Sequence, residues 1–141
     1  MSNRLEGRVA VLTGAGSGIG YATSKRLASE GAHVVAVDTN EETGQAIAKE
    51  VGGIFVKADV TSSEQVENMY KVAFDTYGRI DIAFNNAGIS PPDDDSILVT
   101  GIDAWERVLR VNTTSVYLCC KAVIPYMQKA KKGSIINTAS F

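Results

Sequence analysis

A glycine-rich turn near the N-terminus is the first segment whose residue types could do chemistry. Residues 13–20 read TGAGSGIG and join an expected strand to an expected helix. Glycines permit positive φ and a close backbone approach to a ligand, and the free N–H groups of a helix N-terminus attract an anion. The spacing is T-G-x-x-x-G-x-G, because Ile19 stands where the strict G-x-G-x-x-G pattern has its last glycine. The turn indicates a phosphate site, with a purely structural turn as the alternative.

An acidic residue closes the next expected strand. Asp38 follows Gly20 by 18 residues, where a dinucleotide-binding fold places the carboxylate that hydrogen-bonds the adenosine ribose. A carboxylate there repels a 2′-phosphate, and neither Ser17 nor Thr39 supplies a basic side chain to bind one. The pattern favours NAD(H) over NADP(H). A solvated strand-end carboxylate or a helix cap is the alternative for Asp38.

The elements that must position these residues follow from hydrophobic periodicity. Short β-branched runs alternate with longer amphipathic stretches, which predicts an α/β fold built from βαβ units. The apolar residues of the short runs are mostly consecutive, as in parallel strands covered by helices on both faces. The expected strands are residues 8–13, 33–37, 54–57, 80–85 and 134–138.

Helix boundaries are predicted from capping signals. A capping residue three positions before a glutamate predicts helix starts at Thr39, Thr61 and Asp103. Glycines that can adopt a left-handed conformation predict helix ends, at Gly31, Gly52-Gly53, Gly78 and Gly133. The last expected helix, residues 103–131, is long and contains Pro125, which should kink it or remove one backbone hydrogen bond.

Composition excludes several function classes. A net charge of −2, with 45% hydrophobic and 21% charged residues, argues against a dedicated nucleic-acid or anionic-membrane binder. No apolar run approaches the roughly 20 residues of a membrane span, and the first residues lack a signal-peptide pattern. The adjacent Cys119 and Cys120 cannot readily pair, which favours a reduced, cytoplasmic location. Residues 93–95 are consecutive aspartates and are expected to form a solvated loop, so no metal site is predicted.

Four motifs in succession resemble those of the short-chain dehydrogenase/reductase family, in its compact single-domain branch. They are the glycine turn of residues 13–20, Asp59-Val60 after the third strand, Asn85-Asn86-Ala87-Gly88 after the fourth, and Asn112 in the last helix. The resemblance covers the whole chain in the right order. It implies a Rossmann-type doubly wound parallel sheet with strand order 3-2-1-4-5.

The resemblance also implies roles for individual residues in binding NAD. Gly14 and the backbone of Ser17, Gly18, Ile19 and Gly20 would hold the pyrophosphate, with Ile19 beside the cofactor. Asp38 would bind the adenosine ribose, and Asp59 and Val60 would flank the adenine. The nicotinamide side of the cleft would be lined by Asn86, Ala87 and Gly88. Ligands at the carboxyl ends of parallel strands agree with this assignment.

Two further residues match catalytic positions of the family. Asn112 would distort its helix and position a water, with a solvent-facing helical asparagine as the alternative. Ser140, after the fifth strand, would stabilise charge on the substrate oxygen, or simply open a loop. The family's general acid/base is a tyrosine with a lysine four residues later, about a dozen residues beyond this serine. The pairs Tyr21/Lys25 and Tyr117/Lys121 have that spacing but precede Ser140, and are expected to serve helix packing.

We therefore expect residues 1–141 to form one NAD(P)-binding Rossmann domain, truncated after its fifth strand. The resemblance implies an NAD(H)-dependent oxidoreductase that transfers hydride between nicotinamide and a small-molecule carbonyl or secondary alcohol, for example a 3-oxoacyl reductase or an alcohol dehydrogenase. A non-catalytic dinucleotide-binding fragment lacking the Tyr-x-x-x-Lys base is the alternative. In the family the long helix packs against its counterpart in a neighbouring subunit, so a homo-oligomer is expected for the full-length form.

Overall fold

A single parallel sheet forms the centre of the computed structural model, which describes residues 3–140. Its five strands lie in the order β3-β2-β1-β4-β5, confirming the predicted order. Parallel strands of a doubly wound sheet present their carboxyl ends along one edge, where ligands bind. The strands are β1 (Val9–Thr13), β2 (His33–Asp38), β3 (Ile54–Lys57), β4 (Ile82–Asn85) and β5 (Ser134–Asn137).

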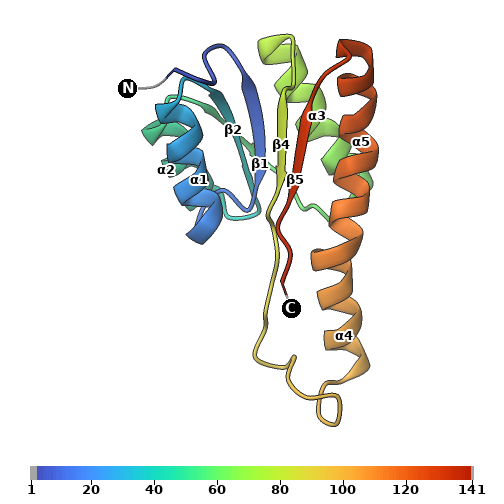
Figure 1. Ribbon diagram of the computed structural model, residues 1–141. Coiled ribbons are helices and arrows are strands. Elements are labelled where there is room, and N and C mark those ends of the chain that lie inside the picture. Colours follow the sequence, from blue (N-terminus) through green and yellow to red (C-terminus); the bar gives the residue numbers. More distant parts are fainter. Residues whose placement is uncertain (1–2, 141) are drawn as a thin grey trace.

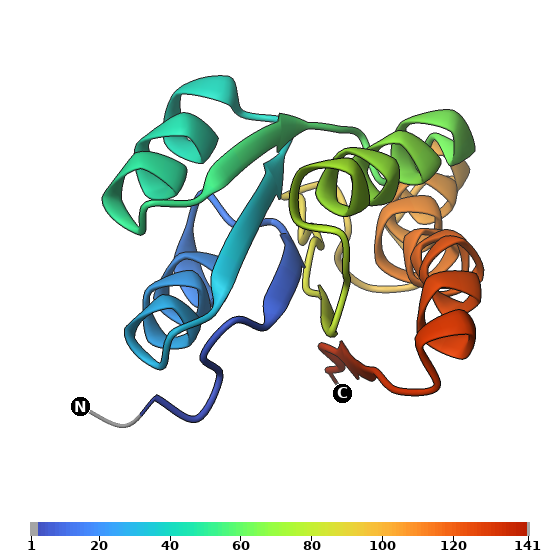
Figure 2. The ribbon, with the colours of Figure 1, turned by 90° about the horizontal axis from the view of Figure 1, so that it is seen from above.

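Helices cover both faces of the sheet. On one face lie α1 (Gly18–Ser29) and α2 (Glu41–Glu50), and on the other lie α3 (Ser63–Tyr77) and the long last helix (Figure 2). That helix consists of α4 (Ile102–Leu109), a π-helical turn η1 (Arg110–Thr114) and α5 (Ser115–Ala130), and it continues through Pro125. Figure 1 shows the loop after β4 and α4 extending beyond the ends of the strands.

Two apolar layers hold the helices to the sheet. Alternate side chains of each strand point to opposite faces, so Ala10 and Leu12 of β1 pack towards α1 and α2, while Val9 and Val11 pack towards α3 and α5. All five residues of β1 are buried. The consecutive apolar runs in the sequence therefore reflect a sheet covered on both sides.

The predicted helix starts are each wrong by one or two residues. Asn40, not Thr39, caps α2, and its side chain accepts a hydrogen bond from Thr43 N (3.1 Å). Ser62, not Thr61, caps α3, and its hydroxyl accepts from Gln65 N (3.3 Å). Both neighbours in each pair are good capping residues, so their types alone do not decide between them.

The last helix also begins and ends differently from the prediction. Gly101, not Asp103, precedes α4, so Asp103 lies inside the first helical turn. Its negative charge there interacts favourably with the helix dipole. At the other end Lys131 (φ 55°) takes the left-handed conformation predicted for Gly133. The added Cβ of a residue at position 133 would lie 2.3 Å from Met127 Sδ. Gly133 therefore allows close packing rather than a positive φ.

Among residues 3–140, no helix is long and apolar enough to cross a membrane. No group of three or more His, Cys, Asp or Glu side chains in that range is placed to hold a metal ion. In the acidic run, Asp93 pairs with Arg107 (2.5 Å). Cys119 and Cys120 are both free thiols, and burial raises the pKa of Cys119 to about 12.

Candidate cofactor cleft

A cleft of about 560 Å³ opens at the carboxyl ends of the central strands. It brings together segments that are far apart in the sequence: the glycine turn, the end of β2, the turn after β3 and the segment after β4. Every residue predicted to bind the cofactor lines it, with the exception of Gly20. These residues are Gly14, Ser17, Gly18, Ile19, Asp38, Asp59, Val60, Asn86, Ala87 and Gly88.

The glycine turn has the backbone geometry of an anion site. Gly14 (φ 66°) and Gly18 (φ 52°) adopt positive φ, which glycine reaches without steric cost. Ser17 is the N-cap of α1 but makes no side-chain capping bond, and no acidic residue lies in the first turn. The N–H groups of that turn lack intrahelical partners and face the cleft end of the helix. Ile19 is 62% exposed there, an apolar surface suited to covering a ligand.

Gly20 lies behind the turn rather than in the cleft. A Cβ at this position would lie 2.0 Å from the carbonyl oxygen of Gly14. The missing side chain lets the first turn of α1 pack directly on the backbone that follows β1. Gly20 therefore shapes the cleft without lining it.

Asp38 is held at the edge of the cleft by backbone donors. Gly16 N donates to its Oδ2 and Asn40 N donates to its Oδ1, both at 2.9 Å. Each carboxylate oxygen thus has one fixed partner and keeps further acceptor capacity. Among the described residues that line the cleft, the charged ones are Asp38 and Asp59. Two carboxylates in the lining make the part of the cleft near Asp38 electrostatically unfavourable for an additional phosphate group, such as the 2′-phosphate of NADP(H).

The turn after β3 is fixed by its own acidic side chain. Asp59 Oδ1 accepts hydrogen bonds from Thr61 N (2.9 Å) and Thr61 Oγ1 (2.7 Å). The side chain of Gln65 accepts from Asp59 N (2.8 Å). These bonds fix the turn whose residues Asp59 and Val60 line the cleft.

A second cleft of about 610 Å³ adjoins the first and contains both predicted catalytic residues, Asn112 and Ser140. Asn112 lies in the π-helical turn η1, where the helix backbone departs from regular α geometry. Its Oδ1 accepts from Ile89 N and its Nδ2 donates to Ile89 O, both at 2.8 Å. The side chain therefore clamps the segment after β4 to the long helix.

Comparison with known proteins matches the family model described as short chain dehydrogenase over residues 8–141. The chain belongs to the short-chain dehydrogenase family. It is 40% identical to secoisolariciresinol dehydrogenase of Forsythia intermedia, covering 99% of this chain and 52% of that protein. It is 41% identical to a 3-oxoacyl-[acyl-carrier-protein] reductase of Thermotoga maritima, covering 97% of this chain and 57% of that protein. The chain thus spans about half the length of these relatives.

A solved structure shows the same fold. The 3-ketoacyl-(acyl-carrier-protein) reductase from Brucella melitensis, complexed with NADH, matches with a TM-score of 0.91 and 34% identity. The match covers 96% of this chain and 58% of that chain. The Rossmann-type architecture predicted from the sequence is therefore confirmed.

Two threonines whose contacts shape the clefts were given no role in the sequence analysis, although Thr13 opens the glycine motif. Thr13 is buried at the end of β1, and its hydroxyl accepts from Asn86 N (3.0 Å) and Ala87 N (3.1 Å). Thr138 lines both clefts. The available signal for Thr138 was its position two residues before Ser140, because alternate residues of an extended segment point to the same side.

Both Tyr-x-x-x-Lys pairs lie outside the two clefts. Tyr21 donates to Glu50 Oε2 (2.8 Å), and Lys25 pairs with the other carboxylate oxygen, Glu50 Oε1 (2.6 Å). Lys121 lies 5.7 Å from the centre of the Tyr117 ring on α5. Both pairs therefore make contacts on the surfaces of helices and not in either cleft.

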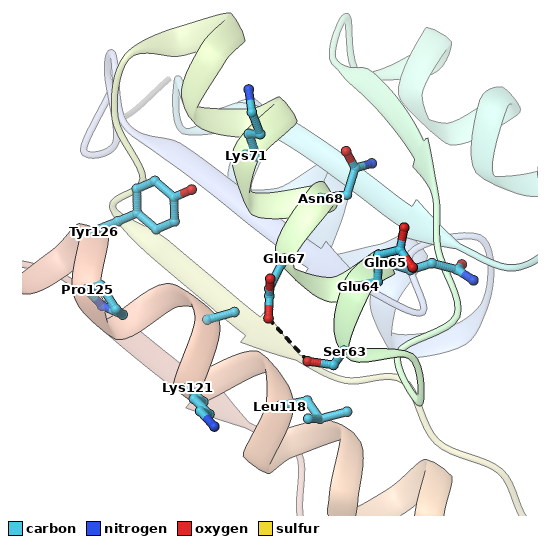
Figure 3. A pocket seen from close by; sticks show the side chains of 11 residues that line it. Ser63, Glu64, Gln65, Glu67, Asn68, Lys71, Leu118, Lys121, Pro125 and Tyr126 are labelled. Atoms are coloured by element: carbon cyan, nitrogen blue, oxygen red, sulfur yellow. Dashed lines mark hydrogen bonds between the residues drawn. The ribbon is translucent and has the colours of Figure 1, made fainter.

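A larger cavity of about 770 Å³ lies between α3 and α5 (Figure 3). Glu67 and Lys71 of α3 and Lys121 and Pro125 of α5 contribute to its walls. None of the residues predicted to bind cofactor or to act in catalysis lines it. The largest of the three openings described is therefore not the one that the predicted cofactor-binding residues line.

Proposed function

We propose that this chain is the cofactor-binding part of an NAD(H)-dependent oxidoreductase acting on a carbonyl or secondary alcohol. The observation that carries the proposal is the convergence of three of the four motifs, the glycine turn, Asp59-Val60 and the segment after β4, on one cleft with the Asp38 carboxylate at its edge. The NADH complex of the structurally similar Brucella melitensis reductase supports the choice of cofactor.

Each wall of the cleft suits one part of a dinucleotide. The N–H groups at the start of α1 bind the pyrophosphate, and the exposed Ile19 covers it. Asp38 accepts hydrogen bonds from the adenosine ribose hydroxyls and repels a 2′-phosphate. Asp59 and Val60 flank the adenine, while the segment Asn86–Gly88 lines the nicotinamide end.

The second cleft provides groups for the reaction. The bound nicotinamide supplies or accepts the hydride. Ser140 donates a hydrogen bond to the substrate oxygen and stabilises the charge that develops there. Asn112 holds the backbone of Ile89 at the border of the two clefts, which fixes the wall against which the nicotinamide and the substrate meet.

A dinucleotide-binding module without catalysis is the second candidate. Among the described residues that line the two clefts there is no tyrosine, lysine or histidine to carry the proton. If this chain binds NADH but does not oxidise or reduce a substrate, that result would favour the non-catalytic module as the function of residues 1–141.

We also propose a cytoplasmic homo-oligomer for the whole protein. The long helix exposes large apolar side chains, among them Trp105 (49%) and Tyr117 (60%), which supports its use in subunit packing.

Fluorescence titration with NADH and NADPH tests the proposed cofactor specificity. The wild-type chain is expected to bind NADH more tightly than NADPH. In Asp38→Ala we expect NADH affinity to fall about tenfold, because hydrogen bonds to a charged group are lost, and the preference over NADPH to shrink. Asp75→Ala, an exposed aspartate on α3, should leave both affinities unchanged. An unchanged ratio of NADH to NADPH affinity in Asp38→Ala would contradict the proposed role of Asp38 in binding the adenosine ribose.

A further inference from the structure

The ends of β4 and β5 are tied together by Thr138. Its backbone N–H donates to Asn85 O (3.1 Å), and its hydroxyl donates to Asn86 Oδ1 (3.0 Å). On the other side, Asn86 Nδ2 donates to Thr13 O (3.4 Å). The carboxamide of Asn86 therefore connects the end of β1 with the end of β5 across the strand between them.

The direction of these bonds is fixed by chemistry. The Thr13 carbonyl can only accept, so the NH₂ group of Asn86 must face it. The Asn86 oxygen then faces Thr138, whose hydroxyl has a single hydrogen to donate. Valine has nearly the shape of threonine but cannot make this bond, whereas serine can.

Thr138 also lies at the border of the two clefts. Residues that line both are Asn86, Ala87, Gly88, Ile89 and Thr138. Four of them form the segment after β4, and Thr138 is the contribution of the segment after β5. This shared wall is where a nicotinamide ring would pass from the cofactor cleft towards Ser140.

We propose that Thr138 is a positioning residue for the nicotinamide half of the dinucleotide, acting through Asn86. The inference rests on the proposed function, because it assumes that the nicotinamide occupies this end of the cleft. The hydroxyl holds the Asn86 carboxamide against the glycine turn and sets the shared wall. The adenosine end, formed by Asp38, Asp59 and Val60, is built by other hydrogen bonds and does not depend on it.

The affinities of Thr138→Val and Thr138→Ser for NADH and for ADP-ribose test this proposal. ADP-ribose lacks the nicotinamide, so the comparison separates effects at the nicotinamide end of the cleft from effects at the adenosine end. Thr138→Val is expected to lower the affinity for NADH about fivefold to tenfold, the effect of one lost hydrogen bond. The affinity for ADP-ribose is expected to change less than twofold. Thr138→Ser is expected to restore NADH affinity to within twofold of wild type. A general structural loss would weaken both ligands together and would overturn the proposal, as would unchanged NADH binding in Thr138→Val.

Amide hydrogen exchange on the ligand-free chain tests the connection separately from the cofactor. We expect the N–H of residue 138 to exchange faster in Thr138→Val than in wild type or Thr138→Ser, because the β4–β5 tie is weakened. Unchanged exchange at residue 138 would overturn the connection whatever the ligands do. Failure of the wild-type chain to bind NADH would instead contradict the proposed function.

Discussion

Replacing Gly20 with alanine is expected to weaken NADH binding by at least about 100-fold, equivalent to roughly 2.7 kcal/mol. The added Cβ would lie 2.0 Å from the Gly14 carbonyl oxygen and 3.0 Å from Ala15 Cα. Both are backbone atoms next to β1, so neither can rotate away as a side chain could. The start of α1 must shift, and its N–H groups then no longer converge on the pyrophosphate. Titration of NADH fluorescence measures the effect.

Gly101→Ala provides the matched control. Gly101 precedes α4, and a Cβ there meets no atom within 4 Å, so this variant should bind NADH within twofold of wild type. Thermal unfolding followed by circular dichroism shows whether both variants are folded at the titration temperature. A folded Gly20→Ala chain with wild-type affinity would contradict the assigned packing of the turn.

Asp81→Asn is expected to lower the free energy of unfolding by about 2 kcal/mol at pH 7. The Asp81 carboxylate is buried before β4 and accepts from Val9 N (2.9 Å) and from Arg79 Nε (2.7 Å) and Nη2 (2.6 Å). Removing one partner of a buried ion pair costs about 3–5 kcal/mol. We expect less because the side chain of Arg79 is 40% exposed and can be hydrated. Urea unfolding measures the difference.

The same pair of proteins should differ in their response to acid. Burial raises the pKa of Asp81, but the hydrogen bonds from Arg79 and Val9 outweigh this, so its pKa in the folded state lies below the ordinary value of 3.8. A group with a lowered folded pKa stabilises the protein above its unfolded pKa, and that contribution is lost as the pH falls through the folded value. The stability advantage of wild type over Asp81→Asn should therefore be full at pH 6 and shrink below about pH 4.

Asp75→Asn is the control for a surface carboxylate. Asp75 pairs with Lys71 on α3, and both side chains are more than half exposed, so the expected loss is much smaller than that of Asp81→Asn. An Asp81→Asn effect as small as that of Asp75→Asn would show that the buried cluster contributes little to stability.

Much of the fold was predictable from local sequence patterns. The consecutive apolar residues of β1 and β2 indicated a sheet covered on both faces, and the glycine turn and Asp38 located one edge of the cleft. The strand order was predicted from the family resemblance. Helix starts were less accurate, because Thr39 and Asn40 are both capping residues and the backbone conformation decides between them.

The contacts within the site that were not predicted depend on long-range register. Asn112 bonds Ile89 because the segment after β4 passes beside the π-helical turn. Thr138 reaches Asn86 because β5 pairs with β4 in the register that sets Asn137 opposite Asn85. Pairs separated by 23 and 52 residues leave no periodic signal in a single sequence. The structure was therefore needed to connect the two clefts.

Chemical-shift mapping of the ¹⁵N-labelled chain with NADH tests the central claim most directly. We expect the largest changes at Gly14, at Ser17–Gly20, at Asp38 and at Asn86–Gly88, with smaller changes at Asp59 and Val60. Residues of the α3–α5 cavity in Figure 3, such as Glu67 and Lys121, should not shift. Chemical-shift changes concentrated in that cavity would contradict the assignment of the cofactor cleft. The absence of any change at NADH concentrations well above those in cells would contradict it as well.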